Sequence, residues 1–496
     1  MKKIIIFVFI LITLNLFSDA RLIKIDGDFS DWQTTPDYSD TVGDIGSGTV
    51  DFKDIFIAND ENYLYIRFSI TNKVDIDREG KTILYIDTDN NSSTGESING
   101  IGADLVWKFA SKKGTFYGNN GSETVYWTDL DYLQSSIIST SEYELRFKRD
   151  AVINEENVFS SDTIKIVLAD KTGDTDNDFA PDSNSIIYTF DNGAVEPYVS
   201  INIDKENSNY IRVLTFNVAH DYENNEDAMW EEPQASAISR ILNALEPQII
   251  LFQEINTHNA DETTTKLEEL YPAPSGYSWH TISYYDSKIS SLYPITQEDH
   301  FANGNIGGLI DLPAEYQTDI YLFCCHLKAL SGYDETRQKE ADTIMQFVRD
   351  DIKQNLPNGT PVIIGGDMNF VDGDGPLHTF ITGDIYDNST YGDDFSPDWD
   401  NTDFTEIRIL HSHAPVNYTE IPSTSYFPGK LDYFIYSDAG NLSIAKKFIL
   451  KTSELPSDVL SNHGLNADDT DVASDHLPVV LDLSIPMTKI ENWYLY

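Results

Sequence analysis

The chain has 496 residues, of which 82 are acidic and 33 are basic, so its formal net charge at pH 7 is −49. Its hydrophobic fraction of 40 %, with 12 % aromatic residues, is enough to fill several cores and excludes a disordered or fibrous protein. Residues 1–200 carry −17 and the remainder −32, so neither part has the basic surface that nucleic-acid binders typically use. A polyanionic substrate would therefore need bound cations or a local basic patch.

The first 20 residues have the pattern of an export signal. Lys2 and Lys3 precede an apolar run from Ile4 to Leu14, and Ser18-Asp19-Ala20 fits a small-x-small cleavage site. No cysteine follows that site, and no later apolar stretch reaches the roughly 20 residues of a membrane-spanning helix. We therefore expect a signal peptide at residues 1–20 and a secreted or periplasmic mature protein without a membrane span.

Residues 22–192 consist of short alternating runs separated by clusters of Gly, Asn and Asp. Within residues 54–68, two segments of period two flank a polar turn, which is the pattern of a β-hairpin. No segment here sustains helical spacing. The pattern predicts an all-β sandwich over residues 22–192, followed by a polar linker at residues 193–208.

Two loops of this module are strongly acidic. The first contains Asp87 and Asp89, and the second contains Asp174, Asp176, Asp178 and Asp182. Alternating oxygen ligands suit Ca²⁺, which takes six to eight of them. Asp and Asn also favour ordinary solvated turns, so a calcium site and a plain turn both remain open for each loop.

Two short motifs carry a resemblance for this module. They are Ile25-Asp-Gly-Asp-Phe-Ser-Asp-Trp32 and Ile86-Asp-Thr-Asp-Asn. The module resembles the family-9-like carbohydrate-binding modules and related secreted β-sandwich domains. The resemblance implies an accessory or sugar-binding module with polysaccharide as a partner. We expect Trp32 to be a core residue rather than a platform for sugar, so the ligand stays open.

After residue 208 the pattern changes to strands alternating with helices. The sequence predicts strands at 212–218, 249–255, 320–326 and 361–369, and helices at 232–245 and 335–356. Pro233 falls in the first turn of a helix, where its missing N–H is not needed. This alternation predicts a layered α/β domain over residues 209–486, with residues 487–496 as a tail.

The only two cysteines, Cys324 and Cys325, are adjacent in the predicted strand 320–326. Neighbouring side chains of a strand point to opposite faces of its sheet. We therefore expect both to be free core residues rather than a disulfide.

Polar residues recur where apolar runs of this domain end. They are Asn217, Glu254, His326, Asp367 with Asn369, Asp432, and Asp475 with His476. A single Asp or Asn after a strand is usually a turn residue, but six such positions in one domain are not explained by turns or by core packing. If these strands share a sheet, their carboxyl ends meet at one edge, where α/β proteins place their sites.

The same positions carry a second resemblance. The motifs are Leu214-Thr-Phe-Asn217, Phe252-Gln-Glu254, Cys325-His326-Leu-Lys-Ala, Gly365-Gly-Asp367-Met-Asn369, Lys430-Leu-Asp432-Tyr-Phe and Ala473-Ser-Asp475-His476-Leu-Pro. In this order they resemble the endonuclease/exonuclease/phosphatase superfamily, which has the DNase I-like fold. The resemblance implies an α/β four-layer sandwich with two facing sheets, a divalent metal (Mg²⁺ or Mn²⁺), and hydrolysis of phosphodiesters or phosphomonoesters.

Phosphoryl chemistry then suggests the metal ligands. A phosphoryl group is anionic, so the site needs a cation on its oxygens, an activated water, and a donor for the leaving group. Glu254 is expected to bind the metal directly. Asn217 and Asp475 would complete its surroundings, some of them through water.

The remaining residues would act on the phosphate and the water. His476 would contact the phosphate, with Asp432 fixing its tautomer. Asp367 would orient or deprotonate the attacking water, and Asn369 would donate to the phosphoryl oxygens. His326 would lie near the leaving group, although the water and leaving-group assignments are exchangeable.

Two positions depart from the pattern of the superfamily. Where members often have Arg in a Ser-Arg-Tyr-Pro-like stretch, this chain has Leu292, and Lys430 replaces the Arg that commonly precedes the Asp-Tyr motif. Lys does not reproduce the bidentate contact of Arg with phosphate. These changes concern the placement of the substrate more than the chemistry.

We therefore expect a secreted divalent-metal-dependent phosphoester hydrolase, foremost an extracellular nuclease. One alternative is a phosphatase, phospholipase or sphingomyelinase-like enzyme on small or lipid phosphoesters. Another is a polysaccharide-binding protein with an inactive hydrolase-like domain, against which the intact set of polar residues argues. The sequence leaves the oligomeric state open.

Overall fold

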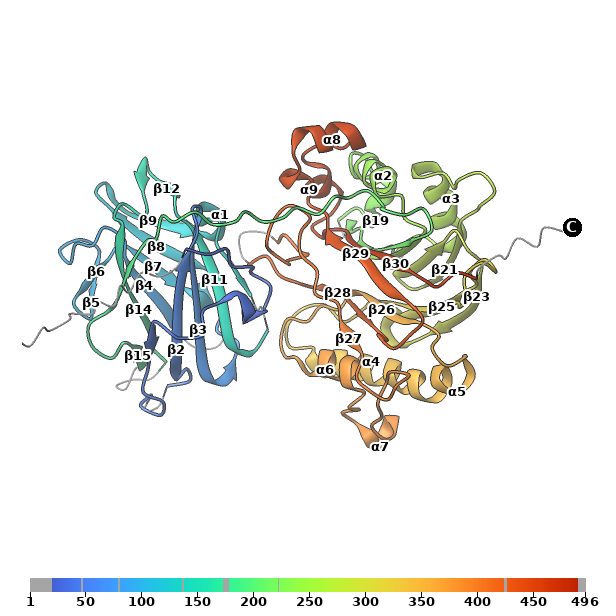
Figure 1. Cartoon of the computed structure of the whole chain (residues 1–496), viewed down its shortest axis with the longest axis horizontal. Coiled ribbons are helices and arrows are strands. Elements are labelled where there is room, and N and C mark those ends of the chain that lie inside the picture. The colour runs from blue at the N-terminus through green and yellow to red at the C-terminus, as the bar shows by residue number, and fades with distance from the viewer. Residues whose placement is uncertain are drawn as a thin grey trace, which may run out of the picture.

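The computed structural model describes residues 20–488 except 46–47, 79–80, 136–137, 173–177, 222 and 423–425. Except for Ala20, the predicted signal peptide lies outside the described residues, as does most of the predicted tail. A β-rich N-terminal part and an α/β C-terminal part lie side by side (Figure 1). Within the described range, no helix has the length and apolar character needed to cross a bilayer.

The N-terminal part contains two main antiparallel sheets, which confirms the predicted β-sandwich. The first has the order β1-β2-β3-β11-β10, with strands Tyr38–Ser39, Phe52–Asn59, Tyr63–Val74, Thr140–Lys148 and Leu133–Ser135. The second has the order β15-β14-β4-β7-β8-β9, with strands Asp178–Ala180, Thr163–Asp170, Thr82–Asp87, Leu105–Lys108, Lys113–Gly118 and Gly121–Tyr126; β16, Ile186–Thr189, also pairs with β14. The predicted hairpin is the antiparallel pair of β2 and β3.

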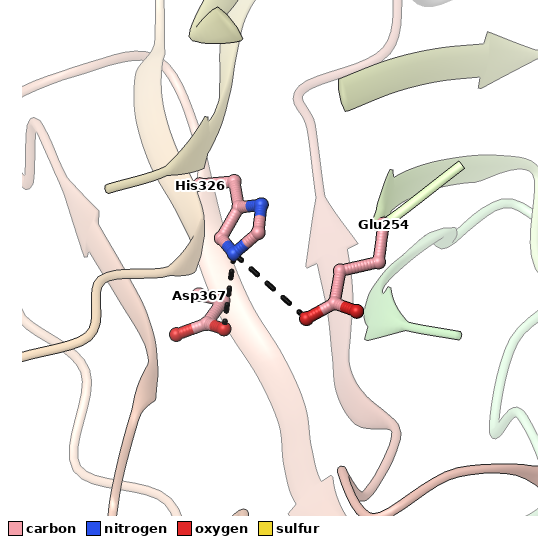
Figure 2. A group of neighbouring side chains, drawn as sticks. All are labelled: Glu254, His326 and Asp367. Carbon is pink, nitrogen blue, oxygen red and sulfur yellow. Dashed lines mark ion pairs between the residues drawn. The ribbon is translucent and has the colours of Figure 1, made fainter. Parts of the chain in front are cut away.

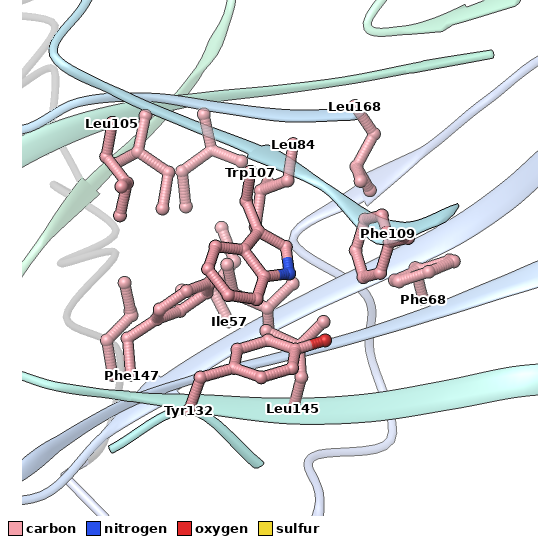
Figure 3. Packing of buried hydrophobic residues seen from close by; sticks show 14 of the residues in the cluster. Ile57, Phe68, Leu84, Leu105, Trp107, Phe109, Tyr132, Leu145, Phe147 and Leu168 are labelled. Atoms are coloured by element: carbon pink, nitrogen blue, oxygen red, sulfur yellow. The ribbon is translucent and has the colours of Figure 1, made fainter. Parts of the chain in front are cut away.

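One hydrophobic cluster fills the space between these sheets, and Trp107 lies within it, surrounded by Tyr132, Phe147 and Phe109 (Figure 3). Trp32 is 4 % exposed and its Nε1 donates to Glu144 Oε2 at 2.9 Å, so it is the core residue that the sequence predicted. A buried indole with a bonded N–H cannot serve as a platform for sugar.

The C-terminal part has two six-stranded mixed sheets. One has the order β21-β22-β20-β17-β30-β29, with strands His280–Tyr284, Ser287–Ser291, Ile249–Gln253, Ile211–Asn217, Val479–Ser484 and Ser443–Ile449. The other has the order β23-β24-β25-β26-β28-β27, with strands Ile295–His300, Ile306–Ile310, Ile320–His326, Val362–Asp367, Asp432–Tyr436 and Thr405–Glu406.

Helices cover the outer faces of both sheets, which confirms the predicted α/β four-layer sandwich (Figure 1). On the first sheet lie α2, Gln234–Leu245, and α3, Ala260–Leu270, with the shorter α8, Ser457–His463, and α9, Asp469–Ala473. On the second lie α4, Asp334–Phe347, and α6, Gly375–Thr382, with the short α5, Lys353–Asn355, and α7, Asn388–Tyr391. The predicted helix 335–356 is thus α4 and α5, joined by a π-helical turn at Val348–Ile352.

Alternation along β25 shows why the layers form. Leu322 and Cys324 face the core between the two sheets, whereas Phe323 and Cys325 face the helices. Both cysteines are free and buried, as predicted. The strand is therefore apolar on both faces because both of its faces are covered.

The segment 193–208 contains no helix or strand, yet it packs on the C-terminal part. Ile203 is buried among residues of α2 and β17, and the N–H of Ile201 donates to the carbonyl of Ser412 at 2.7 Å. Although its composition is polar, this segment packs against the C-terminal part.

The two parts of the chain also interlock through the segment between β27 and β28. Val416 forms a parallel bridge with Ile25, and Phe427 is 4 % exposed inside the sandwich core. Asn417 Nδ2 donates to the carbonyl of Asp26 at 3.0 Å. Part of the C-terminal domain is therefore built into the N-terminal sandwich.

Candidate active site

The predicted polar residues meet at one edge of the two facing sheets, and not along a single sheet as the sequence argument assumed. Asn217 ends β17 and Glu254 follows β20 in the first sheet. His326 ends β25 and Asp367 ends β26 in the second. The site therefore lies between the two sheets.

Asp432 and His476 reach this edge by a different route from the one predicted. Asp432 begins β28, which is antiparallel to β26 and pairs Asp432 with Asp367. His476 precedes β30, which is antiparallel to β17. The prediction that they follow the carboxyl ends of strands is wrong, because in an antiparallel pair the amino end of one strand lies beside the carboxyl end of its neighbour.

Glu254, His326 and Asp367 form the centre of the site (Figure 2). The Nε2 atom of His326 lies 3.7 Å from Asp367 Oδ2 and 4.0 Å from Glu254 Oε1. Glu254 has a φ of +64°, an unfavourable backbone conformation for a residue with a side chain, directly after its strand. Strained backbone of this kind is common at functional sites.

Asn217 connects the two carboxylates of this centre. Its Nδ2 donates to Glu254 Oε1 at 3.0 Å and to Asp367 Oδ2 at 3.1 Å, while its Oδ1 accepts from the N–H of Ala219 at 3.0 Å. In this orientation Asn217 positions the two carboxylates as a donor, and its oxygen, the predicted ligand atom, accepts from the backbone.

Each of the two imidazoles is held by its own carboxylate. His326 Nδ1 lies 2.7 Å from Asp286 Oδ2, and His476 Nδ1 lies 2.8 Å from Asp432 Oδ2. The Nε2 atoms of both rings then face Asp367 Oδ2, each at 3.7 Å. The pairing of Asp432 with His476 is the one expected from the resemblance, and both rings have their free nitrogen directed into the site.

Asp286 is a site residue that the sequence reasoning missed. It lies in the turn between β21 and β22, among polar residues where an Asp has no distinguishing signal. Its Oδ1 is buried and has no hydrogen-bond partner among the described residues. One oxygen therefore orients His326, and the other remains available.

The carboxylates keep both rings in their charged form. Burial disfavours the imidazolium, but its hydrogen bond to Asp286 and the charges of Asp367, Asp286 and Glu254 outweigh burial and raise the pKa of His326 to about 9. The pKa of His476 is raised in the same way, against burial, by Asp432 and Asp367. Burial and the neighbouring carboxylates raise the pKa of Asp367 to about 6, although the two imidazoles oppose this.

Two other predicted site residues do not belong to the group of three whose ligand atoms converge at this centre. Asn369 donates its backbone N–H to Asp367 Oδ1 at 3.0 Å, and its Nδ2 donates to the carbonyl of Leu327 at 3.1 Å. Its amide therefore fixes the loop after β26. Asp475 is exposed and is not among the side chains whose ligand atoms lie within 4.8 Å of one another.

Glu420 is a second site residue that could not be predicted from its local sequence. It lies in the irregular segment before β28, and its backbone forms an isolated antiparallel β-bridge with that of His476. Burial, and then the carboxylates of Asp367, Asp475 and Asp432, raise its pKa to about 7, although His476 opposes this. Glu420 thus adds a further carboxyl group beside His476.

The basic residues near the site are engaged elsewhere. Lys430 forms an ion pair with Glu406, and Arg337 is fully buried, where it donates to the carbonyls of Lys328 and Leu330 and pairs with Asp372. Lys328 is exposed. Lys430 and Arg337 are therefore committed to other partners, whereas the two imidazoles face Asp367 directly.

The donor set of the centre fits a divalent cation. Glu254 and Asp367 each present a carboxylate oxygen there, and the Nε2 atom of His326 completes a group of three atoms within 4.8 Å of one another. With His326 in its charged form, the two carboxylates would be the ligands. Carboxylate oxygens are the ligands that Mg²⁺ and Mn²⁺ favour. The carboxylates around the two imidazoles also outnumber them, so a bound cation would relieve repulsion among them.

The predicted calcium residues of the sandwich fall into two acidic clusters. Asp87 and Asp89 are grouped with Asp104, which the sequence reasoning did not include. Asp178 is grouped with Asp40 and Asp44, also not foreseen. Asp182 is exposed, and Asp174 and Asp176 lie outside the described residues.

Solved structures similar to this chain include D. rerio TDP2 humanized by 14 mutations (13 % identity, 56 % of this chain and 100 % of that chain, TM-score 0.36). The human Nocturnin catalytic domain with bound sulfate has 18 % identity over 58 % of this chain and 97 % of that chain, with a TM-score of 0.35. ANGEL2, a 2′,3′-cyclic phosphatase in complex with adenosine-2′,3′-vanadate, has 15 % identity over 57 % of this chain and 98 % of that chain, with a TM-score of 0.38.

No curated protein matches the chain closely enough to count as a relative. The family model of the Endonuclease/Exonuclease/phosphatase family matches residues 214–476. This segment covers more than half of the 496 residues and runs from the strand that carries Asn217 to His476. The chain therefore belongs to the endonuclease/exonuclease/phosphatase family, whose members hydrolyse phosphoester bonds.

Proposed function

We propose that this protein is a secreted, divalent-metal-dependent phosphodiesterase that cleaves nucleic acid. The observation that carries the proposal is the position of Asp367, whose Oδ2 lies 3.7 Å from the free ring nitrogens of both His326 and His476. Hydrolysis of a phosphodiester needs a group that accepts a proton from water and an acid that protonates the leaving oxygen. One carboxylate between two imidazoliums supplies both.

The roles follow from the charges of these residues. Asp367, once ionised, accepts a hydrogen bond and then the proton from the attacking water. His476, held by Asp432, donates to a phosphoryl oxygen, and His326, held by Asp286, donates to the leaving oxygen. Because the two rings face Asp367 at the same distance, separate variants of each are needed to assign the leaving-group side.

A divalent cation bound by Glu254 and Asp367 would supply additional positive charge for the phosphoryl oxygens. Asn217, which donates to both carboxylates, would hold these ligands in place. Among the described residues no Arg or Lys forms an ion pair with Glu254 or Asp367, so a bound cation would offset the charge of these carboxylates.

Exposed aromatic side chains support nucleic acid as the substrate. Tyr285, next to Asp286, is 72 % exposed, and Tyr333 is exposed with Lys328 Nζ 5.2 Å from its ring centroid. Stacking of a base on such a ring contributes about 1–3 kcal/mol and tolerates any sequence. An acidic enzyme that has few cations for the backbone would therefore hold its substrate through bases.

The charge of the domain favours a second candidate, a small or lipid phosphoester. Residues 201–496 carry −32, and Arg337 and Lys430 are both engaged in ion pairs. A long polyanion would be repelled at low salt, whereas a small phosphoester is repelled much less. This candidate differs from the first in substrate size and not in chemistry.

A substrate panel separates the two. Purified protein with Mg²⁺ or Mn²⁺ would be assayed on single- and double-stranded DNA, RNA, bis(p-nitrophenyl) phosphate, p-nitrophenyl phosphate and sphingomyelin vesicles, with His476→Asn as the inactive control. The proposal expects nucleic acid to have the highest kcat/KM, and Tyr285→Ala to raise KM for nucleic acid but not for bis(p-nitrophenyl) phosphate. Preference for a monoester or for sphingomyelin would replace the nuclease assignment.

We also propose export and an accessory role for the sandwich. The support is the signal pattern of residues 1–20 and the resemblance of the first module to secreted sandwich domains. If the export signal is cleaved as expected, the mature protein recovered from outside the cytoplasm begins at Arg21, which N-terminal sequencing would establish. Pull-down on insoluble polysaccharides would test the polysaccharide partner.

A further inference from the structure

A second acidic cluster lies in the sandwich, remote in sequence from the catalytic residues. Asp40 follows β1 of one sheet, Asp44 lies four residues later, and Asp178 begins β15 of the other sheet. One ligand oxygen from each of the three lies within 4.8 Å of the others. The cluster therefore joins the two sheets at a point where three carboxylates converge.

Two oxygens of this cluster are buried without any donor. Asp178 is 1 % exposed; its Oδ2 accepts from the N–H of Phe52 at 2.7 Å, but its Oδ1 has no hydrogen-bond partner among the described residues. Asp40 likewise has one bonded and one unbonded oxygen: its Oδ1 accepts from the hydroxyl of Tyr38 at 3.0 Å, and its buried Oδ2 has no hydrogen-bond partner among the described residues. Buried acceptors without partners are rare and costly, so each such atom needs an explanation.

No basic side chain of the described part of the chain forms an ion pair with Asp40, Asp44 or Asp178. The surroundings add negative charge instead, because Asp182 faces Asp40 and Asp44, and Asp51 faces Asp178. Three carboxylates that converge without a basic partner repel one another, and a bound cation would relieve that repulsion.

The other acidic cluster of the sandwich is different. Asp104 Oδ2 accepts from the N–H groups of Thr88 at 2.9 Å and Asp89 at 3.2 Å, and Asp87 Oδ2 pairs with Lys165 Nζ at 3.1 Å. The protein itself supplies the donors and a cation there. Of these two acidic clusters of the sandwich, the cluster of Asp40, Asp44 and Asp178 combines converging carboxylates with buried oxygens that lack donors among the described residues.

We propose that Asp40, Asp44 and Asp178 bind a structural calcium ion that holds the two sheets of the sandwich together. Carboxylate oxygens from separate segments are typical ligands of Ca²⁺, which tolerates irregular geometry and completes its shell with carbonyl groups and water. Binding gives the two orphaned oxygens a partner and cancels the repulsion among the three charges. The site is distinct from the catalytic centre and would act on stability.

The experiment uses the full chain, freed of metal with a chelator, and follows thermal unfolding while Ca²⁺ is added. At a hundredfold excess over the dissociation constant, we expect the Tm to rise by about 5–10 °C. Asp178→Asn should behave in two opposite ways. It should raise the Tm in chelator, because it removes one repelling charge while its side-chain carbonyl still accepts from Phe52, and it should lose most of the calcium-induced rise.

Three controls make the outcome decisive. Asp44→Asn, at an exposed position, should also reduce the rise in Tm without any risk to folding, whereas Asp150→Asn, an exposed charge elsewhere on the sandwich, should not. Calorimetric titration with Ca²⁺ in a Glu254→Gln background, which alters the catalytic centre, should detect one site fewer when Asp178→Asn is added. An unchanged number of sites, or an equal change of Tm with and without Ca²⁺, would overturn the proposal.

Discussion

The ring of Phe427, which precedes β28 in the catalytic domain, stacks on Trp107 of the sandwich with centroids 6.0 Å apart and planes at 27°. Phe427 also lies 5.0 Å from the ring of Tyr132, so it completes the aromatic group around Trp107 that Figure 3 shows. Because a residue of the catalytic domain packs in the core of the sandwich, the two domains are not structurally independent.

The same segment contacts the active site at its other end. Thr419 Oγ1 accepts from the N–H of Asp432 at 2.9 Å, and the carbonyl of Thr419 accepts from the N–H of Leu477 at 2.7 Å. The N–H of Ile421 donates to the carbonyl of Asp475 at 2.8 Å. The sandwich core and the backbone that carries Asp432 and His476 are therefore connected through a single segment.

We expect Phe427→Ala to lower both stability and turnover. Loss of a buried Phe costs about 3–5 kcal/mol, which corresponds to a fall in Tm of roughly 10 °C, and a loosened segment should reduce kcat more than it raises KM. Calorimetry and steady-state kinetics would measure both effects. Tyr426→Ala, at an exposed neighbouring position, is the matched control, and Phe427→Leu should recover most of the activity. If Phe427→Ala lowers the Tm but leaves kcat unchanged, the sandwich does not position the site.

Much of the fold could be predicted from the sequence, because its elements are periodic. Helix α2 and strands β17, β20, β25 and β26 were predicted within about two residues, since buried strands and an amphipathic helix leave clear patterns. The catalytic polar residues could be predicted for the opposite reason, because Glu254 and Asp367 break apolar runs where packing alone would favour apolar side chains.

The remaining features depend on contacts distant in sequence. Asp286 and Glu420 lie in polar, irregular segments where an acidic residue is ordinary, and only the fold brings them to His326 and His476. Phe427 is one aromatic residue in a loop, and nothing in its local sequence indicates that it enters another core. The two-sheet origin of the site could not be predicted either, since strand pairing was not known.

Glu254→Gln should abolish most of the metal-dependent activity. The substitution keeps the shape of the side chain and can still accept from Asn217, but it removes the charge that offsets a cation. We expect kcat/KM to fall at least roughly a hundredfold and the concentration of Mg²⁺ needed for half activity to rise, while the Tm changes little. Glu269→Gln, an exposed residue of α3, is the control for charge. Turnover near the wild-type value would remove Glu254 from the metal site.

Asp286→Asn should shift the pH dependence of the reaction. The Asp286 carboxylate helps to raise the pKa of His326 to about 9, so the ring stays protonated below that pH and loses its proton as the pH rises through it. Without the hydrogen bond and charge of this carboxylate the pKa of His326 falls, so activity that needs the imidazolium is lost at a lower pH. Profiles of kcat/KM from pH 5 to 10 would detect the shift, and Asp286→Glu should partly restore the wild-type profile. An unchanged alkaline limb would exclude His326 as the acid.

The distribution of charge around the site determines how salt should affect kcat/KM on nucleic acid. The chain from residue 201 onward carries −32, and the side chains of Arg337 and Lys430 form ion pairs with Asp372 and Glu406. Proteins that bind nucleic acid through many Lys and Arg contacts lose affinity steeply with salt, because each contact releases counterions. Here few such contacts are available, and long-range repulsion is screened over about 10 Å at 0.1 M salt.

With nucleic acid as substrate and metal kept saturating, kcat/KM should therefore stay flat or rise as NaCl increases from low to moderate concentration. Lys328→Ala tests an exposed cation two residues after His326 and should make the rise slightly steeper, because it removes an attraction that salt would otherwise weaken. A small diester such as bis(p-nitrophenyl) phosphate should show almost no salt dependence with either protein. A steep fall with salt in the wild type would mean that a basic surface outweighs the acidic one, and that backbone phosphates, not stacked bases, hold the substrate.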